Sequence, residues 1–277
     1  YWDTHIPYKP PEPFDKLFTP NVASIGMYDF LRTLPYPRLR KWLSLWIQGI
    51  KSPEQMVSLY DGEIRYVDYN ISRLINILEE LGIKDRTLLI ITADHGENLL
   101  EHSNKGLCFQ HLGLYDTVIK VPLIVTGSSI LSGIKIKELA QNIDIMPTIL
   151  DILGKLNKLS KSMLKLLDGN TLVPIIEGKA NDFRDKLLIE EVITSSVPIN
   201  DYVRHRALRT QDFKYIVDIS MKSEELYDLR KDPEEIHNIA NNNPNIVEEM
   251  RGELQSIIKY HARKHVSLLA KGVLSHQ

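Results

Sequence analysis

Residues 52–82 show the pattern of a long amphipathic helix. Ser52 suits the N-cap, Pro53 suits the first helical position, and Gly82 suits the position just after the last turn. Between these signals, apolar residues recur at three- and four-residue spacing: Tyr60, Ile64, Val67, Ile71, Leu74, Ile75, Leu78 and Leu81. Because this spacing places them on one side of a helix, the pattern predicts a helix with one buried face.

Two shorter runs, at residues 87–93 and 121–125, are apolar on both faces. Each has the length of a strand, and strands that are apolar on both sides are typical of a parallel sheet covered by helices. A helical pattern follows from Ile143 to Leu153 and ends at Gly154. This order of elements favours an α/β fold, with a mostly parallel sheet sandwiched by helices.

The pattern changes after about residue 160. Four short strand-like segments follow, with turns between them, at residues 187–192, 206–210, 213–217 and 225–229. A helical pattern from Ile246 to His261 comes after them. We therefore expect two domains: an α/β core over residues 1–160, and a small antiparallel β subdomain with a terminal helix over residues 161–277.

Charge and composition exclude several classes of protein. The 277 residues carry 34 Lys and Arg against 36 Asp and Glu, so no basic field indicates nucleic-acid binding. The apolar runs are far shorter than the ~20 residues that cross a bilayer, so we expect no membrane segment. The single cysteine, Cys108, excludes an internal disulfide framework and a multi-thiolate zinc site. None of these features indicates a cellular compartment.

Asp94 and His95 directly follow the first of the two apolar runs. Ligands of α/β sheets bind beyond the carboxyl ends of strands, and a carboxylate beside an imidazole suits Ca²⁺, Mg²⁺, Mn²⁺ or Zn²⁺. His111 lies before the second run and is placed to reach the same crevice. His5 lies in a proline-rich loop that fixes its orientation, whereas His102 is expected to be solvated. Taken singly, the Asp94–His95 pair is equally typical of a helix cap beside a surface histidine, and His5 and His111 are more typical of structural histidines.

Five segments combine into a more specific pattern: Asp3–Pro11, Tyr60–Asp68, Thr92–Glu97, His111–Leu123 and Glu225–Asn238. In this order they match H-x-P-[YF]-x-P-P, Y-x-x-x-I-x-x-x-D, T-[SA]-D-H-G-[ED], [KH]-x-x-x-Y-[ED]-x-x-x-[RK]-V-P-L and E-L-Y-D-L-x-x-D-P-x-E-x-x-N. The ordered set resembles the sulfatases of the alkaline phosphatase superfamily, and it spans nearly the whole chain. The resemblance implies an alkaline-phosphatase-like α/β core.

The resemblance also implies a role for each of the four residues. Asp94 and His95 would be ligands of a divalent metal, for which Ca²⁺ is the family's common ion and Mn²⁺ or Mg²⁺ are alternatives. His5 would bind the sulfate group and protonate the leaving oxygen, and His111 would contact the sulfate or its leaving group. The substrate would be a small-molecule or saccharide sulfate ester, attacked at sulfur by a hydrated aldehyde oxygen.

One part of the family's pattern does not occur in these 277 residues. The family's nucleophile is a formylglycine made from Cys or Ser in C/S-x-P-S-R, and the sequence around Cys108 does not fit this motif. An Asp-Asp pair that completes the metal ligands is likewise not found. In the family both elements precede the loop of His5. We therefore expect them upstream of Tyr1, and we expect this chain alone to be inactive.

Two alternatives remain open. An Asp-His pair in place of Asp-Asn also suits the phosphonate monoester hydrolases and phosphodiesterases of the same superfamily, which often use Mn²⁺. A non-catalytic binding protein would keep the scaffold without a nucleophile. The sequence upstream of Tyr1 would discriminate between these alternatives.

Overall fold

The computed structural model describes residues 2–20, 24–127, 130, 133–180, 183–193, 203–218 and 223–270. The chain divides into two units. Unit 1 comprises Tyr1–Ser128 with Ile193–Tyr202, and unit 2 comprises Ser129–Val192 with Val203–Gln277. The domain boundary near residue 160 that the sequence suggests stays a prediction.

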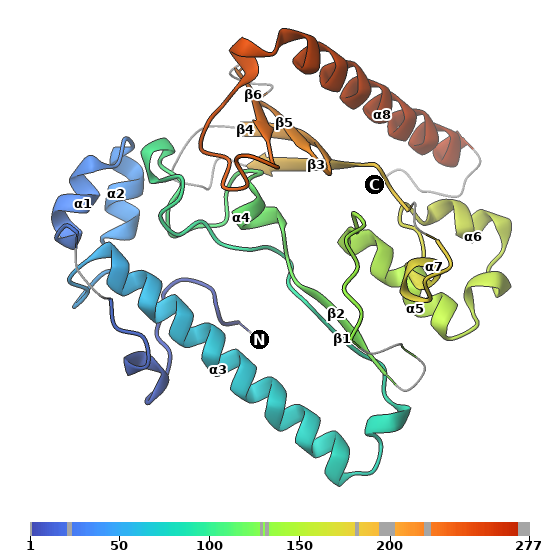
Figure 1. The fold of residues 1–277 in the computed structure, drawn as a ribbon, viewed down its shortest axis with the longest axis horizontal. Coiled ribbons are helices and arrows are strands. Elements are labelled where there is room, and N and C mark those ends of the chain that lie inside the picture. Colours follow the sequence, from blue (N-terminus) through green and yellow to red (C-terminus); the bar gives the residue numbers. More distant parts are fainter. Residues whose placement is uncertain are drawn as a thin grey trace. The chain divides into compact units, whose positions relative to one another are not determined.

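Unit 1 is dominated by one long helix and a pair of strands (Figure 1). Its elements are η1 (Phe14–Lys16), α1 (Met27–Thr33), α2 (Pro37–Leu43), α3 (Pro53–Glu80), η2 (Lys84–Arg86), β1 (Leu89–Thr92), η3 (Ser103–Lys105), α4 (Asp116–Ile119) and β2 (Leu123–Thr126). The predicted signals of α3 are confirmed. The Ser52 hydroxyl accepts a hydrogen bond from the Gln55 N–H at 3.3 Å, and Gly82 adopts a φ of 63° after the last turn.

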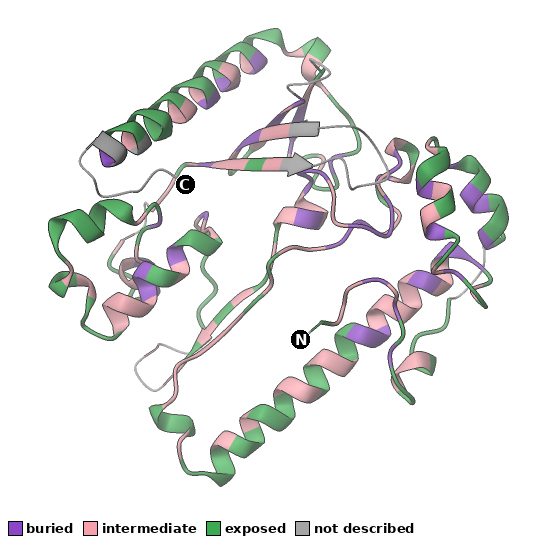
Figure 2. Ribbon diagram, turned by 180° about the vertical axis from the view of Figure 1, so that it is seen from behind, coloured by how far each residue is buried: buried purple, intermediate pink, exposed green. Residues whose placement is uncertain are grey.

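The burial of α3 differs from its amphipathic pattern. Its buried residues, Met56, Gly62 and Glu63 among them, all lie in the first half of the helix (Figure 2). The predicted apolar stripe is more exposed, with Leu74 at 41% and Leu81 at 65% exposure. The N-terminal loop and η1 pack on the first half, through Lys9 with Glu63 and Phe14 with Tyr66, whereas the far end of α3 leads into η2. Spacing predicts which residues share a face, not how much of that face is covered.

The two apolar runs form the strands β1 and β2, which pair in antiparallel register. Leu89 lies opposite Thr126, and Thr92 lies opposite Leu123. The sequence pattern suggested neighbours in a parallel sheet. Apolar character reports burial rather than direction, and the connection between these strands carries only the short elements η3 and α4. Residues 93–122 are long enough for a parallel crossover, but such crossovers usually carry a helix that packs on the sheet, and α4 has only four residues.

The core of unit 1 lies around α1, α2, the first turns of α3 and the loop before α4. Phe109 is fully buried there, with its ring centroid 6.3 Å from Phe30 and 6.4 Å from Tyr8. Cys108 is buried beside it, and burial raises the pKa of its thiol to about 12. The thiol is therefore kept protonated and packs as a small apolar group.

Unit 2 contains a group of short helices, a sheet and a long helix. Its elements are η4 (Asn142–Asp144), α5 (Ile145–Ile152), η5 (Leu156–Lys158), α6 (Lys161–Leu166), α7 (Val173–Ile176), β3 (Lys186–Ile193), β4 (Val203–Thr210), β5 (Phe213–Asp218), β6 (Ser223–Asp228), η6 (Ala240–Asn242) and α8 (Pro244–Ala270). The sheet has the order β3-β4-β5-β6, and β4, β5 and β6 pair antiparallel. Helix α8 lies along this sheet (Figure 1), with Val247, Met250 and Leu254 packed against residues of the strands. The predicted antiparallel sheet and terminal helix are confirmed.

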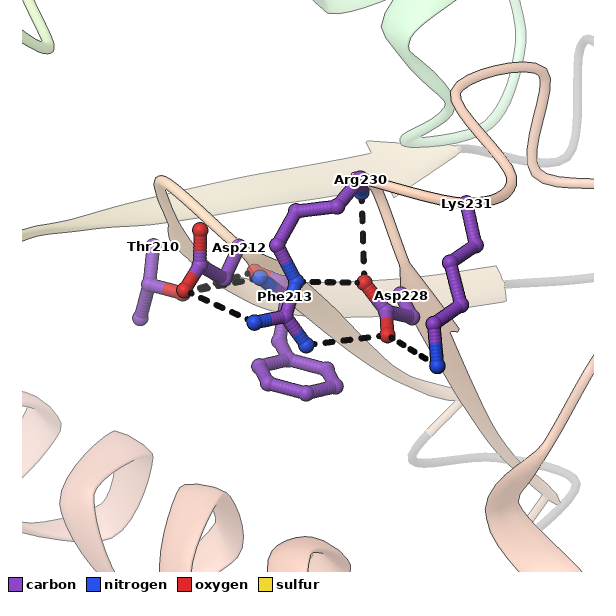
Figure 3. A network of polar contacts seen from close by, with 6 residues as sticks. All are labelled: Thr210, Asp212, Phe213, Asp228, Arg230 and Lys231. Carbon is purple, nitrogen blue, oxygen red and sulfur yellow. Dashed lines mark hydrogen bonds and ion pairs between the residues drawn. The ribbon is translucent and has the colours of Figure 1, made fainter.

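The motif at residues 225–238 stabilises the turns that follow β6. The guanidinium of Arg230 donates to both oxygens of Asp228 at 2.9 Å and lies 5.0 Å from the Phe213 ring (Figure 3). Farther along, the Asn238 side chain accepts from the Leu226 N–H at 3.0 Å and donates to the Glu224 carbonyl at 3.1 Å. These contacts give this motif a structural role in unit 2.

Among the described residues, none of the helices combines the length and apolar character that a bilayer span requires.

Candidate functional site

Asp94 and His95 lie just beyond the end of β1. One carboxylate oxygen of Asp94 accepts from the His95 N–H at 3.0 Å, and the other lies 3.8 Å from His95 Nε2. The Asp94 side chain is 90% exposed, and that of His95 is 33% exposed. The two groups therefore present an oxygen and a nitrogen side by side at the surface of unit 1.

Gly96 fixes the backbone after this pair by a close approach to another segment. Its N–H donates to the Val118 carbonyl at 2.6 Å, and a Cβ at this position would lie 2.2 Å from the Thr117 carbonyl oxygen. Its φ is not among the positive values that favour glycine. Glycine is therefore required here for its lack of a side chain.

The rings of three histidines and one tryptophan form a column in unit 1. His95 stacks on His111 with ring centroids 4.1 Å apart and planes 25° apart. His111 lies 5.4 Å from His5, and His5 lies 4.8 Å from Trp2. The structure thus brings together the four residues singled out in the sequence, Asp94 through its neighbour His95. Their catalytic and metal-binding roles stay predictions.

Backbone carbonyls set the orientation of two of these rings. Nδ1 of His95 lies 2.8 Å from the Gly96 carbonyl oxygen, and Nδ1 of His5 lies 2.7 Å from that of Ile6. A carbonyl oxygen only accepts, so Nδ1 carries the hydrogen in both rings. In the neutral ring Nε2 is then left as the nitrogen with a lone pair, which is the form that ligates a metal.

Asp94 and His95 fit two positions of a divalent-metal site by their donor atoms and geometry. Within the described ranges, no group of three or more His, Cys, Asp or Glu side chains is arranged to hold a metal ion. A complete ligand set therefore needs donors beyond these two residues.

Asn98 links the loops that carry His95 and His111. It is fully buried, and its side chain donates to the Leu112 carbonyl at 2.7 Å and accepts from the Thr117 hydroxyl at 2.7 Å. Its backbone pairs with that of Gln110. The sequence analysis missed Asn98, because a single asparagine in a loop carries no signal of burial.

Unit 1 also contains two buried carboxyl groups close to Tyr8. Glu63 is 2% and Glu97 is 8% exposed. Burial raises the pKa of Glu63 to about 7 and that of Glu97 to about 8. The charge of Glu63 adds to the upward shift of the Glu97 pKa, and the neighbouring Tyr8 hydroxyl opposes it. Glu97 stands inside the T-A-D-H-G-E segment, whereas nothing in the sequence distinguishes Glu63 from a solvated residue of α3.

The expectation that His102 is solvated is wrong. Its side chain is 1% exposed and stacks on the Tyr115 ring at a centroid distance of 3.9 Å. Local polarity suggested exposure, but an aromatic residue thirteen positions later covers the ring.

Comparison with known proteins identifies relatives of this chain. The sulfatase family model matches residues 2–155, and a model described as N-sulphoglucosamine sulphohydrolase, C-terminal, matches residues 106–260. Bovine (Bos taurus) arylsulfatase K is 30% identical over 195 residues, which cover 70% of this chain and 35% of that protein. An N-acetylglucosamine-6-O-sulfatase of Bacteroides thetaiotaomicron is 31% identical over 231 residues, covering 77% of this chain and 40% of the relative.

Solved structures share the fold. One, of a protein in complex with its substrate D-glucosamine-2-N,6-O-disulfate, has 26% identity and a TM-score of 0.62, covering 79% of this chain and 45% of that one. The phosphonate monoester hydrolase of Silicibacter pomeroyi has 23% identity and a TM-score of 0.70, covering 94% and 54%. The chain thus spans between a third and a little over half of these relatives. The family model alone covers more than half of the 277 residues, and the chain belongs to the sulfatase family.

Proposed function

We propose that this chain carries part of the catalytic site of an enzyme that hydrolyses sulfate esters with the aid of a divalent metal ion. The observation that carries the proposal is the column of His95, His111 and His5 beside Asp94, in a chain of the sulfatase family. It gathers imidazole nitrogens and a carboxylate oxygen at one place, which suits a divalent metal ion and an anionic ester.

His5 and His111 would bind the sulfate group and assist departure of the alcohol. Negative charge develops on the departing oxygen, and a positioned imidazolium stabilises or protonates it. With Nδ1–H of His5 bound to the Ile6 carbonyl, Nε2 is the nitrogen available to hold that proton. His111, between His5 and His95, would contact the sulfate or its leaving group.

Asp94 and His95 would hold the metal ion, Ca²⁺ in the first place and Mn²⁺ or Mg²⁺ as alternatives. When bound, the ion supplies positive charge that polarises the sulfate and orients it. The proposed reaction also needs further metal ligands and a formylglycine nucleophile, and the motif for that nucleophile does not occur in these 277 residues.

The proposed substrate class is a sulfated saccharide. Two observations support it: a relative with 31% identity is named N-acetylglucosamine-6-O-sulfatase, and a structure with 26% identity contains D-glucosamine-2-N,6-O-disulfate as its substrate. Both relatives align over more than three quarters of this chain.

The test uses the protein expressed from its gene with everything encoded upstream of Tyr1. Hydrolysis of 4-nitrophenyl sulfate and N-acetylglucosamine 6-sulfate is measured with Ca²⁺ or Mn²⁺ present. We expect His5→Ala and His111→Ala each to lower kcat/KM by roughly 10²–10⁴-fold, the usual contribution of a general acid or base. His237→Ala is the matched control, because the His237 side chain is 80% exposed and lies in unit 2.

The same assay includes a phosphonate monoester, which tests the alternative of a phosphonate monoester hydrolase. Faster hydrolysis of that substrate than of either sulfate ester would favour the alternative. Hydrolysis of none of them would favour a binding protein. Activity that survives both histidine substitutions would contradict the roles proposed for these rings.

A further inference from the structure

The loop that carries His5 has no regular secondary structure of its own. Residues 2–13 contain no helix or strand in the described structure. Within the loop, His5 is held by its backbone N–H, which donates to the Trp2 carbonyl at 3.1 Å, and by its contact with Ile6. The position of the His5 ring relative to His111 therefore depends on what the loop packs against.

Helix α3 provides that support. The Lys9 N–H donates to Oε1 of Glu63 at 2.6 Å, a bond that joins positions 54 residues apart. The Glu63 side chain is almost entirely buried, so this bond is shielded from water. The preceding residue of the helix confirms how closely the loop lies: a Cβ on Gly62 would be 2.6 Å from the Phe14 carbonyl oxygen.

Tyr8, the residue before Lys9, connects α3 with the segment that leads to His111. Tyr8 is 3% exposed, and its ring meets Tyr60 of α3 at 5.3 Å and Phe109 at 6.4 Å. Phe109 lies two residues before His111 in the sequence. Helix α3 thus touches the His5 loop through a hydrogen bond and, through Tyr8, touches the segment that leads to His111.

The second carboxylate oxygen of Glu63, Oε2, is buried without a hydrogen-bond partner among the described residues. Burial of a carboxylate with a hydrogen bond to only one oxygen is destabilising, because the other oxygen has lost its hydrogen bonds to water. An apolar residue would pack here at lower cost, so the feature that requires Glu63 is the bond to the Lys9 N–H.

We propose that Glu63 is a positioning residue, which sets the His5 ring against His111 by holding the backbone of the His5 loop on α3. That this placement serves catalysis rests on the function proposed above. The placement itself does not, since it concerns only contacts within unit 1.

The experiment observes His5 directly in the isotopically labelled 277-residue chain. The ring cross-peak of His5 is assigned by its loss in His5→Gln, and amide hydrogen exchange of Lys9 is measured in parallel. The variants are Glu63→Ala, which removes the acceptor, and Glu63→Gln, which keeps an acceptor oxygen. Met56→Ala is the matched control, because Met56 is equally buried in α3.

In Glu63→Ala we expect the His5 cross-peak to move away from the ring-current shifts of Trp2 and His111, and exchange of the Lys9 amide to accelerate by roughly tenfold or more. Glu63→Gln is expected to restore the wild-type cross-peak and slow exchange. Met56→Ala weakens the core but is expected to leave the His5 cross-peak in place.

Three results would overturn the proposal: an unmoved His5 cross-peak in Glu63→Ala, a displacement in Glu63→Gln as large as in Glu63→Ala, or an equal displacement in Met56→Ala. If Glu63→Ala does not fold, Glu63→Asp replaces it. Its carboxylate is one methylene too short to reach Lys9, so an unmoved His5 there also overturns the proposal. No step measures hydrolysis, so a chain that fails to act on sulfate esters leaves this result unaffected.

Discussion

We expect the stability of unit 2 to depend on one buried ion pair, between Lys214 and Glu235. Lys214 lies on β5, and its Nζ is 2.7 Å from Oε1 of Glu235. Both side chains are buried, at 0% and 1% exposure. Glu235 also adopts a φ of 56°, in the left-handed region that non-glycine residues avoid.

Removal of the carboxylate by Glu235→Ala leaves the ammonium of Lys214 buried without this counter-ion. Breaking a buried ion pair from one side lowers the free energy of unfolding by about 3–5 kcal/mol. Glu235→Gly removes the same carboxylate, but glycine adopts the left-handed backbone without strain, so we expect a free energy of unfolding about 1 kcal/mol higher than that of Glu235→Ala. The double variant Lys214→Met, Glu235→Met removes both charges together, and we expect it to lie within about 1–2 kcal/mol of the wild type.

Urea denaturation followed by far-ultraviolet circular dichroism measures the four free energies. The three tryptophans, Trp2, Trp42 and Trp46, all lie in unit 1, so their fluorescence reports separately on that unit. The expected order of stability is wild type and double variant, then Glu235→Gly, then Glu235→Ala. A loss below about 1 kcal/mol in Glu235→Ala, or an equal loss in the double variant, would refute the reasoning from a buried ion pair broken on one side.

Three further predictions concern unit 1. Gly96→Ala would force its Cβ to within 2.2 Å of the Thr117 carbonyl oxygen, so we expect a loss of about 1–3 kcal/mol in urea denaturation and a displaced His95 ring in NMR spectra; unchanged values would contradict the close approach. The pKa of Glu97 is raised from 4.5 to about 8, so the folded state holds a proton that the unfolded chain releases. The stability that protonated Glu97 contributes is full below pH 4.5 and is lost as the pH rises through about 8. In urea denaturation at a series of pH values, we expect Glu97→Gln to reduce this pH dependence. Parallel curves of stability against pH for the two proteins would contradict the raised pKa of Glu97. Asn98→Asp replaces the amide donor to the Leu112 carbonyl by an acceptor. We therefore expect the free energy of unfolding to fall by about 1–3 kcal/mol in urea denaturation, and NMR to show a weaker His95–His111 ring contact. An unperturbed ring contact would argue that Asn98 does not link the two loops.

Local signals in the sequence predicted the elements well. Ser52, Pro53 and Gly82 mark the ends of α3 because capping and positive φ depend on a residue's own chemistry. The short strands of unit 2 were recognisable for the same reason, since their apolar runs are separated by turns. Pairing direction was not recognisable, because the partner of a strand is chosen by the fold as a whole, and β1 and β2 pair antiparallel.

The site was predictable only as far as its motifs reach. His5, Asp94, His95 and His111 were found through the order of segments that resemble sulfatase motifs, and the three histidine rings lie together. Their supports were not found. The residues next to Glu63 on the helix do not distinguish it from a solvated residue, because its burial depends on a loop 54 residues away in the sequence. Burial of a polar side chain by a distant segment leaves no trace in its immediate neighbours.

The contact between His95 and the Gly96 carbonyl has a consequence for how an ion would enter the site. With the hydrogen already committed to Nδ1, a neutral His95 offers Nε2 without tautomeric rearrangement. Coordination by the neutral ring therefore liberates no hydrogen ion. The heat released on ion uptake should accordingly be the same in buffers of different ionisation enthalpy, as long as the solution is alkaline enough to keep the imidazole uncharged.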